Sequence, residues 1–222
     1  MPIGNDVVDL RDPETLPGGL HPRFDARVFT PEERGALEDR PEAARRRRWR
    51  LWAAKEAAFK VARKLDPATS WSPVRFAVRE PGSCAGESTA PAARRRGRVE
   101  CAAGSIEVEW DESQAWVHAR AWSGPAEPHS TVWGVAEASE RDLSRAVRRL
   151  ARERMAARLS RPIDQLQVRM SRGRSARIPS LWVAGRPVAL DLSLSHHGRL
   201  VAFACLSPER AASISAAGAP AD

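Results

Sequence analysis

The sequence predicts an α+β fold in which long helices pack on small antiparallel sheets. Two stretches, one from residue 41 or 42 to residue 65 and one over residues 139–159, are rich in residues that favour helices. Each is followed by short segments in which apolar and polar residues alternate, as they do in half-buried strands. With 222 residues, the chain fits one large domain or two fused domains of half that size.

The composition is typical of a globular protein with an anionic partner. Hydrophobic residues make up 42% of the chain, and no run approaches the 18 or so apolar residues of a membrane span. The N-terminus lacks the pattern of a signal peptide, and the three cysteines suggest neither a disulfide framework nor a zinc site. We therefore expect a cytoplasmic protein. The net charge of +8 favours an anionic partner without identifying it.

The first predicted strand, over residues 3–10, carries Asp6 and Asp9. Side chains alternate along a strand, so these carboxylates point to opposite faces and do not readily share one ion unless the strand ends between them. Taken alone, Asp6 fits an ion ligand and a turn-capping aspartate equally well. We keep Asp6 as a candidate ligand and leave Asp9 open.

A helix is predicted to start at Thr30, after a loop over residues 16–22. Thr30 is the expected N-cap, Pro31 occupies the first helical position, and Glu33 completes a capping box. The capping box explains Glu33 fully, so no catalytic role is assigned to it.

In the long helix that follows, Trp52, Glu56 and Lys60 lie four residues apart and form one line, with Lys55 beside them. A surface helix with a Glu56–Lys60 pair, contributing about 0.2–0.5 kcal/mol, would explain this pattern. However, the chain has 36 lysines and arginines together, and only three of them are lysines. Where arginine is the usual cation, a lysine indicates a need for a compact ammonium group, and a functional site is an equally good explanation.

Strands are predicted over residues 74–78, 105–110 and 115–122, and residues 111–114 join the last two as a hairpin. Residues 81–97 read as a mobile surface loop. Three tryptophans of this region are expected to pack in the core and not to form a stacking platform: Trp110, Trp116 and Trp122.

The second half opens with a helix whose predicted capping box runs from Ser139 to Asp142. Short strands follow over residues 181–184, 188–190 and 200–206. Residues 213–222 are expected to form a disordered tail.

Several motifs occur along the chain: Gly4-Asn5-Asp6-Val7-Val8-Asp9, Phe29-x-x-x-Glu33, Trp52-x-x-Lys55-Glu56-Ala57-x-x-Lys60, Gly185-Arg186-Pro187 and Leu194-Ser195-His196-His197-Gly198. Together they resemble the G-x-D, W-x-x-K-E-A-x-x-K, G-K-P and S-H-x-G elements of the 4'-phosphopantetheinyl transferase superfamily. Arg186 replaces the usual lysine, and Val8 stands where surfactin-type members usually carry a third acidic residue.

The resemblance implies two pseudo-equivalent lobes, each a long helix packed on a small antiparallel sheet. It places one lobe at residues 1–135, the other at residues 136–212, and the tail at residues 213–222. In surfactin-type members the S-H-x-G segment precedes G-x-D, whereas here it follows. We therefore expect the two lobes in swapped order, as in a circular permutation, and a single chain that completes the cleft as a monomer.

The resemblance also implies transfer of 4'-phosphopantetheine from coenzyme A to a serine of an acidic acyl or peptidyl carrier protein, with release of 3',5'-ADP. Such carriers serve fatty acid, polyketide or nonribosomal peptide synthesis. Asp6 and Glu56 would hold Mg²⁺, Lys60 would contact the phosphates, and Glu56 could accept the serine proton. Lys55 is a weaker candidate for proton transfer or phosphate contact. Three residues would bind the 3'-phosphate of coenzyme A: Arg186, Ser195 and His196. His197 is assigned no role, although strand alternation allows only one of the two histidines to face the site.

Two alternatives remain at this point. One is a coenzyme A or carrier-binding module without turnover. The other is a nucleic-acid-binding protein that uses the basic runs at residues 45–48 and 94–96, although no recognised nucleic-acid-binding signature accompanies them.

Overall fold

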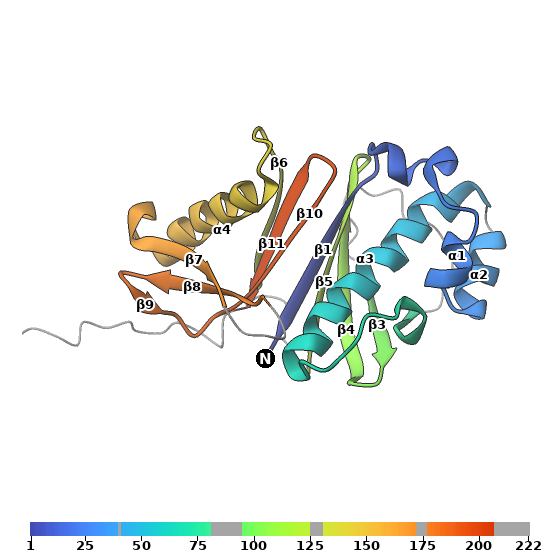
Figure 1. Cartoon of the computed structure of the whole chain (residues 1–222), viewed down its shortest axis with the longest axis horizontal. Coiled ribbons are helices and arrows are strands. Elements are labelled where there is room, and N and C mark those ends of the chain that lie inside the picture. Colours follow the sequence, from blue (N-terminus) through green and yellow to red (C-terminus); the bar gives the residue numbers. More distant parts are fainter. Residues whose placement is uncertain (40, 81–94, 125–130, 172–176, 207–222) are drawn as a thin grey trace, which may run out of the picture.

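A computed structural model describes residues 1–39, 41–80, 95–124, 131–171 and 177–206. It confirms the predicted α+β class, because its helices pack on antiparallel sheets. Figure 1 shows two lobes side by side. We call the described residues up to 124 the first lobe and those from 131 onward the second lobe. Much of the predicted loop at 81–97 and all of the predicted tail lie outside the described residues.

The first lobe is built on a five-stranded sheet with the order β1-β5-β4-β3-β2. Its strands are β1 (Ile3–Asp9), β2 (Ala77–Arg79), β3 (Arg95–Cys101), β4 (Gly104–Glu112) and β5 (Trp116–Ser123). The long helix α3 (Pro41–Leu65) packs across β1, β5 and β4. Two short helices, α1 (Phe24–Val28) and α2 (Pro31–Glu38), and three 3-10 turns complete the lobe: η1 (Pro13–Thr15), η2 (Pro17–Gly19) and η3 (Pro73–Arg75).

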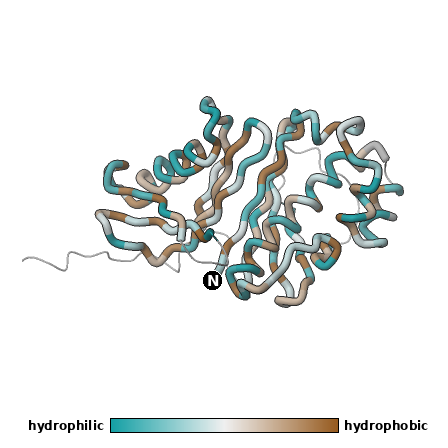
Figure 2. Tube along the Cα trace, viewed as in Figure 1, coloured by the Kyte–Doolittle hydropathy of each residue, from teal (hydrophilic) through white to brown (hydrophobic). Residues whose placement is uncertain are grey.

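The second lobe contains a three-stranded sheet with the order β10-β11-β6 and the helix α4 (Leu143–Leu159) packed on it. Its strands are β6 (Thr131–Glu137), β10 (Asp191–His197) and β11 (Leu200–Leu206). After the turn η5 (Ile163–Gln165), a small sheet is formed by β7 (Leu166–Met170), β8 (Pro179–Val183) and β9 (Arg186–Pro187). Hydrophobic residues follow the central strands of both lobes (Figure 2).

The lobes meet where β1 runs beside β10, along a line that we call the β1–β10 seam (Ile3–Asp9 against Asp191–His197). Backbone N–H groups of β1 donate to side chains of β10 in rising order along both strands: Ile3 to Asp191 Oδ2 (2.6 Å), Asn5 to Ser193 Oγ (2.9 Å) and Asp9 to His197 Nδ1 (3.2 Å). The two strands therefore run parallel, and side chains replace a backbone ladder between them.

The structure confirms several predicted elements and corrects others. The capping box of Thr30 and Glu33 is present. The N-cap of α4 is Asp142 and not Ser139, because the Asp142 side chain accepts from the backbone of Arg145. The predicted strand at 74–78 is instead the turn η3 followed by β2. The unpredicted strand β6 pairs with β11, so residues 131–135 lie in the sheet of the second lobe and not in the first.

None of the helices in the described part of the chain combines the length and the apolar character that a membrane span requires.

Candidate active site

The site begins with a close approach between β1 and α3. A Cβ atom added to Gly4 would lie 2.0 Å from the backbone oxygen of Ala57 and 3.2 Å from the Cβ of Lys60. Only glycine fits at this point, and the small side chains of Ala57 and its neighbours let the helix approach. The glycine of G-x-D and the alanine of K-E-A thus share one structural task, which is to bring Asp6 against α3.

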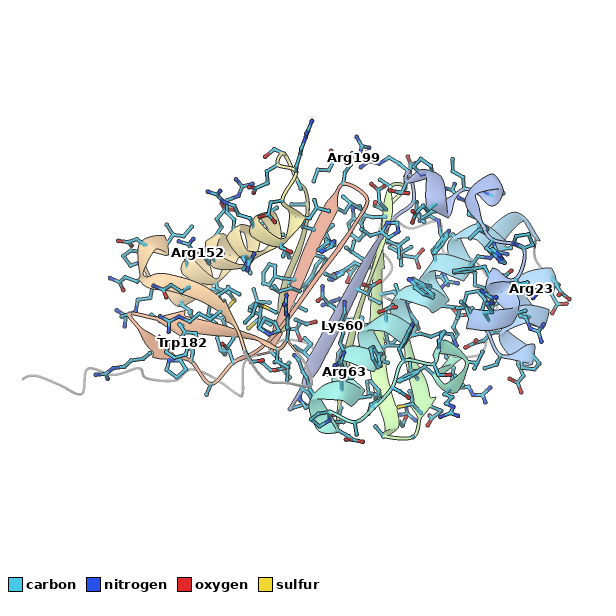
Figure 3. All side chains as sticks on the ribbon, viewed as in Figure 1. Arg23, Lys60, Arg63, Arg152, Trp182 and Arg199 are labelled. Atoms are coloured by element: carbon cyan, nitrogen blue, oxygen red, sulfur yellow. The ribbon has the colours of Figure 1, made fainter. Side chains whose placement is uncertain are left out.

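This approach gathers three of the predicted site residues: Asp6, Glu56 and Lys60. The ammonium group of Lys60 lies 3.2 Å from Asp6 Oδ1 and donates to the backbone oxygen of Asn5 (2.6 Å). Asp6 is 9% exposed, and Glu56 is half-buried. Figure 3 shows Lys60 near the middle of the molecule, between the two lobes.

Burial sets the charge state of these carboxyl groups. It raises the pKa of Asp6 above its ordinary value, and interactions with Lys60, then with His197 and the backbone of Val7, oppose that rise. The pKa of Glu56 is raised to about 7, first by burial and second by the charge of Asp6, while Lys60 lowers it. A carboxyl group with a pKa near neutrality is suited to accepting a proton.

The three lysines of the chain make similar contacts. Each ammonium group donates to at least one backbone oxygen and pairs with one carboxylate. Lys60 caps Asn5, and Lys64 donates to the backbone oxygens of Ile3 and Leu192 (both 2.8 Å) as well as to Asp191 (2.7 Å). Lys60 and Lys64 therefore satisfy backbone oxygens of β1, and Lys64 also links β1 to β10.

Lys55 points away from this cluster into the first lobe, which is a correction to its candidacy. Its side chain is fully buried, and its ammonium group pairs with Glu33 (2.8 Å) and donates to the backbone oxygens of Phe76 (2.6 Å) and Pro73 (3.1 Å). Burial lowers its pKa, and Glu33 opposes that change. The structure places Lys55 in a buried ion pair between α3 and α2, out of reach of a phosphate beside Asp6.

We predict that Lys55→Met lowers the free energy of unfolding by about 3 kcal/mol, because it leaves Glu33 charged and buried without its partner. Urea denaturation measures this change. Arg145→Met is the control, because Arg145 on α4 is 79% exposed and its loss should change stability by less than about 0.5 kcal/mol. Equal effects of the two substitutions would contradict the assignment.

Asp9 lies on the other face of β1 from Asp6. Its carboxylate is 1% exposed and accepts from the backbone N–H groups of Arg11 (2.9 Å) and Arg199 (3.3 Å). These bonds lower its pKa despite burial. Because β1 continues from Asp6 to Asp9, Asp9 does not join the cluster. Its carboxylate instead holds the turn between β10 and β11 through the N–H of Arg199.

The residues expected to bind the 3'-phosphate are not brought together. Arg186 is exposed on β9, at the end of the second lobe farthest from α3 (Figure 1). Trp182, which pairs with Pro187 of β9, is likewise far from Lys60 in Figure 3. Ser195 is buried and accepts from the Asn5 amide (2.9 Å), whereas His196 is exposed.

His197, to which the sequence assigned no role, faces β1 instead. It shares its side of β10 with Ser195 and Ser193, two and four residues earlier. The period of two was visible in the sequence as Ser193-x-Ser195-x-His197, but which face turns toward β1 was not.

The cluster fits a magnesium ion in its donor chemistry. Asp6 pairs with Lys60, whose charge also lowers the pKa of Glu56, and burial raises the pKa of both carboxyl groups. A divalent cation would neutralise the two carboxylates. Magnesium is commonly held by one or two carboxylates, with water and substrate phosphate as further ligands. Val8 is fully buried in the hydrophobic core, and the described residues contain no group of three or more potential ligands. Asp6 and Glu56 thus form a pair without a third carboxylate.

The basic run at 45–48 is used within the chain. Arg45 donates to the backbone oxygens of Leu10 and Thr15, and Arg46 donates to that of Ser113. Arg47 donates to the backbone oxygen of Ala36 and pairs with Glu80, and Arg48 pairs with Asp25. Of the second run, residue 94 lies outside the described residues, and Arg96 pairs with Glu109 (3.4 Å). Because these arginines are engaged within the chain, the basic runs do not support a nucleic-acid interface.

Comparison with known proteins bears on the part of the chain that holds the cluster. Residues 2–95 match the family model described as the 4'-phosphopantetheinyl transferase superfamily. No curated protein matches the chain significantly. The match covers β1, the whole of α3 and the close approach between them. The resemblance seen in the motifs is therefore confirmed for residues 2–95, the segment that is similar to the 4'-phosphopantetheinyl transferase superfamily.

Proposed function

We propose that the protein transfers 4'-phosphopantetheine from coenzyme A to a serine of an acyl or peptidyl carrier protein in a magnesium-dependent reaction. The observation that carries this proposal is the pair of buried Asp6 and half-buried Glu56 with Lys60, inside the segment that matches the superfamily. In the reaction, a bond forms between the serine oxygen and the phosphorus that carries pantetheine. The bond to the other phosphate breaks, and 3',5'-ADP leaves.

Each residue of the cluster has a task in this chemistry. Asp6 and Glu56 would hold Mg²⁺, which when bound neutralises charge on the diphosphate. Lys60 would contact a phosphate oxygen while it also holds the edge of β1. Glu56, with its pKa near 7, would accept the serine proton directly or through water. Transfer of this kind depends on positioning and on neutralising charge, which are what the cluster offers.

An acidic carrier domain is the proposed partner. Between residues 131 and 206 the chain has 14 arginines and only six acidic residues. Such an excess attracts an acidic protein to the second lobe and speeds encounter at low salt. We propose a monomer, because both strands of the seam come from one chain.

Intact mass spectrometry of apo carrier domains tests the proposal. Acyl and peptidyl carriers are incubated with the protein, coenzyme A and Mg²⁺, beside a control with EDTA. We expect a metal-dependent gain of one phosphopantetheine group on at least one carrier, with an equal amount of 3',5'-ADP. Tight binding of coenzyme A without any gain of mass would instead identify a binding module.

Magnesium should stabilise the protein more at high pH than at low pH. The pKa of Glu56 is raised from 4.5 to about 7, so between these values the folded protein holds a proton that the unfolded chain has lost. Its contribution to stability is therefore present below pH 4.5 and is lost as the pH rises through about 7.

Magnesium binds the ionised form and opposes this loss. We expect millimolar Mg²⁺ to raise the melting temperature by several degrees at about pH 8 and by about one degree or less at about pH 6. Thermal denaturation followed by circular dichroism measures the difference, and Glu56→Gln should abolish it. An equal shift at both pH values would contradict the assignment of Glu56.

A further inference from the structure

We propose that Lys64 is a positioning residue for the transfer reaction. From the last turn of α3 it fixes β1, the strand that carries Asp6, and at the same point it holds β10 of the second lobe. The inference rests on the proposed function and adds to it a residue that acts through β1. None of the sequence motifs described above includes Lys64.

Side chains of α3 and β10 satisfy the free edge of β1. This strand is the outermost of its sheet, and β5 pairs with its other edge. On the free edge, the N–H groups of Ile3 and Asn5 donate to side chains of β10. The backbone oxygens of the same two residues accept from Lys64 (2.8 Å) and Lys60 (2.6 Å). The position of β1 therefore depends on side chains from both lobes.

The spacing of the two lysines matches the spacing of the strand. Lys60 and Lys64 lie four residues apart on α3, which is a rise of about 6 Å. The oxygens of Asn5 and Ile3 lie two strand residues apart, which is a rise of about 6.7 Å. The two contacts can therefore form together in only one register of β1 along α3.

This register decides where Asp6 lies beside Glu56. Asp6 comes one residue after the oxygen that Lys60 holds, and Glu56 lies one turn before that lysine. The close approach at Gly4 sets the distance between the strand and the helix, whereas the two lysines set the position of the strand along the helix. A slide of β1 would change the separation of the two carboxylates proposed to hold the metal.

Lys64 differs from Lys60 because it also binds the second lobe. Its ammonium group donates to the backbone oxygen of Leu192 (2.8 Å) and pairs with Asp191 Oδ2 (2.7 Å). The same Oδ2 atom accepts from the N–H of Ile3 (2.6 Å). The side chain of Lys64 is only 9% exposed, so its loss leaves oxygens of both lobes without a donor that water replaces poorly.

Lys64→Met removes the donor and keeps an unbranched side chain. We expect kcat to fall about 10- to 100-fold, because a misplacement of about 1 Å in a site costs on the order of 100-fold in rate. The KM for coenzyme A should change by less than about threefold. The melting temperature should fall by about 3–10 °C, so rates are compared at a temperature at which circular dichroism shows each variant to be folded.

Magnesium binding gives a second readout that needs no turnover. At about pH 8, Mg²⁺ should raise the melting temperature of Lys64→Met by less than about half of the rise in the wild type. A purely structural role of Lys64 would lower the melting temperature equally with and without Mg²⁺ and leave this rise unchanged.

Asp191→Ala tests whether Lys64 acts together with its partner in the second lobe. Alone, it should lower kcat about 3- to 10-fold, and it tests the link even if Lys64→Met does not fold. Because the two residues act as one unit, the double variant should lose no more than about threefold beyond Lys64→Met. Losses that multiply would show that the two residues act independently and would overturn the shared role.

Arg48→Met is the matched control. Arg48 is another cation of α3 that pairs with a carboxylate, Asp25 of α1, through two bonds of 2.7 Å, and its side chain is 17% exposed. This pair joins two helices within the first lobe and does not involve β1. Its loss should lower the melting temperature by a similar amount and leave kcat within about twofold of the wild type.

The carrier assay and the melting curves together decide the proposal. Wild-type kcat in Lys64→Met, or an equal loss of kcat in Arg48→Met, would overturn it while leaving the proposed function intact. A wild-type protein that modifies no carrier would overturn the proposed function itself. In that case the magnesium-dependent rise in melting temperature still shows whether Lys64 positions Asp6.

Discussion

Glu56→Gln should abolish transfer of phosphopantetheine while leaving the fold intact. The substitution removes one of the two carboxylates proposed to hold magnesium and the group proposed to accept the serine proton. General base catalysis alone is worth about 100- to 10,000-fold, so we expect kcat to fall by at least about 1000-fold. Intact mass spectrometry of the carrier over a time course measures this loss.

Stability distinguishes a chemical effect from a structural one. Glutamine has nearly the shape of glutamate and lacks the charge that burial disfavours, so Glu56→Gln should melt at the wild-type temperature or above it. Glu153→Gln is the control, because Glu153 on α4 is 51% exposed and, in the described structure, pairs only with Arg149 (3.8 Å). Glu153→Gln should retain full activity. Turnover by Glu56→Gln at the wild-type rate would remove Glu56 from the chemistry.

Gly4→Ala should weaken both stability and activity, although it adds one methyl group. The new Cβ would lie 2.0 Å from the backbone oxygen of Ala57, and no side-chain rotation relieves a contact with backbone. The helix α3 must then move away from β1. We expect a loss of more than about 3 kcal/mol in the free energy of unfolding. The displacement also separates Asp6 from Glu56, and a misplacement of about 1 Å costs on the order of 100-fold in rate.

Gly35→Ala provides the matched control for Gly4→Ala. Gly35 lies in α2, and a Cβ added there would meet nothing within 4 Å. Because alanine favours a helix more than glycine does, this substitution should leave activity unchanged and raise stability by up to about 1 kcal/mol. Denaturant unfolding and the carrier assay should therefore separate the two glycines. Wild-type behaviour of Gly4→Ala would show that the approach of β1 to α3 does not position the site.

Local sequence patterns predicted the parts of the structure that depend on local contacts. The capping box of α2 and the extent of α3 follow from residues a few positions apart, and both agree with the structure. The cluster could also be predicted. Glu56 and Lys60 lie one helical turn apart, and the motif that contains Asp6 belongs to the same superfamily as theirs. The strand β3 was missed because its arginines at 95, 96 and 98 hide the alternation of buried Gly97 and Val99.

Contacts between distant segments decided what the sequence did not predict. Asn5 and Ser193 are 188 residues apart, and their bond sets which face of β10 turns to β1. A shift by one residue would have turned His196 to the seam in place of His197. Likewise, Lys55 is next to Glu56 in the sequence, but its ammonium group is buried in the first lobe. There it binds Glu33 of α2 and the backbone oxygen of Phe76, which follows η3. The swapped order of the lobes stays a prediction.

The central claim is that Asp6 and Glu56 together hold the metal at which coenzyme A reacts. A crystal structure of the protein with coenzyme A and Mg²⁺ tests it most directly. We predict one magnesium ion bound by both carboxylates and by the diphosphate of coenzyme A, with Lys60 on a phosphate oxygen. A diphosphate bound away from β1 and α3, or an ion without Asp6 and Glu56 among its ligands, would contradict the claim.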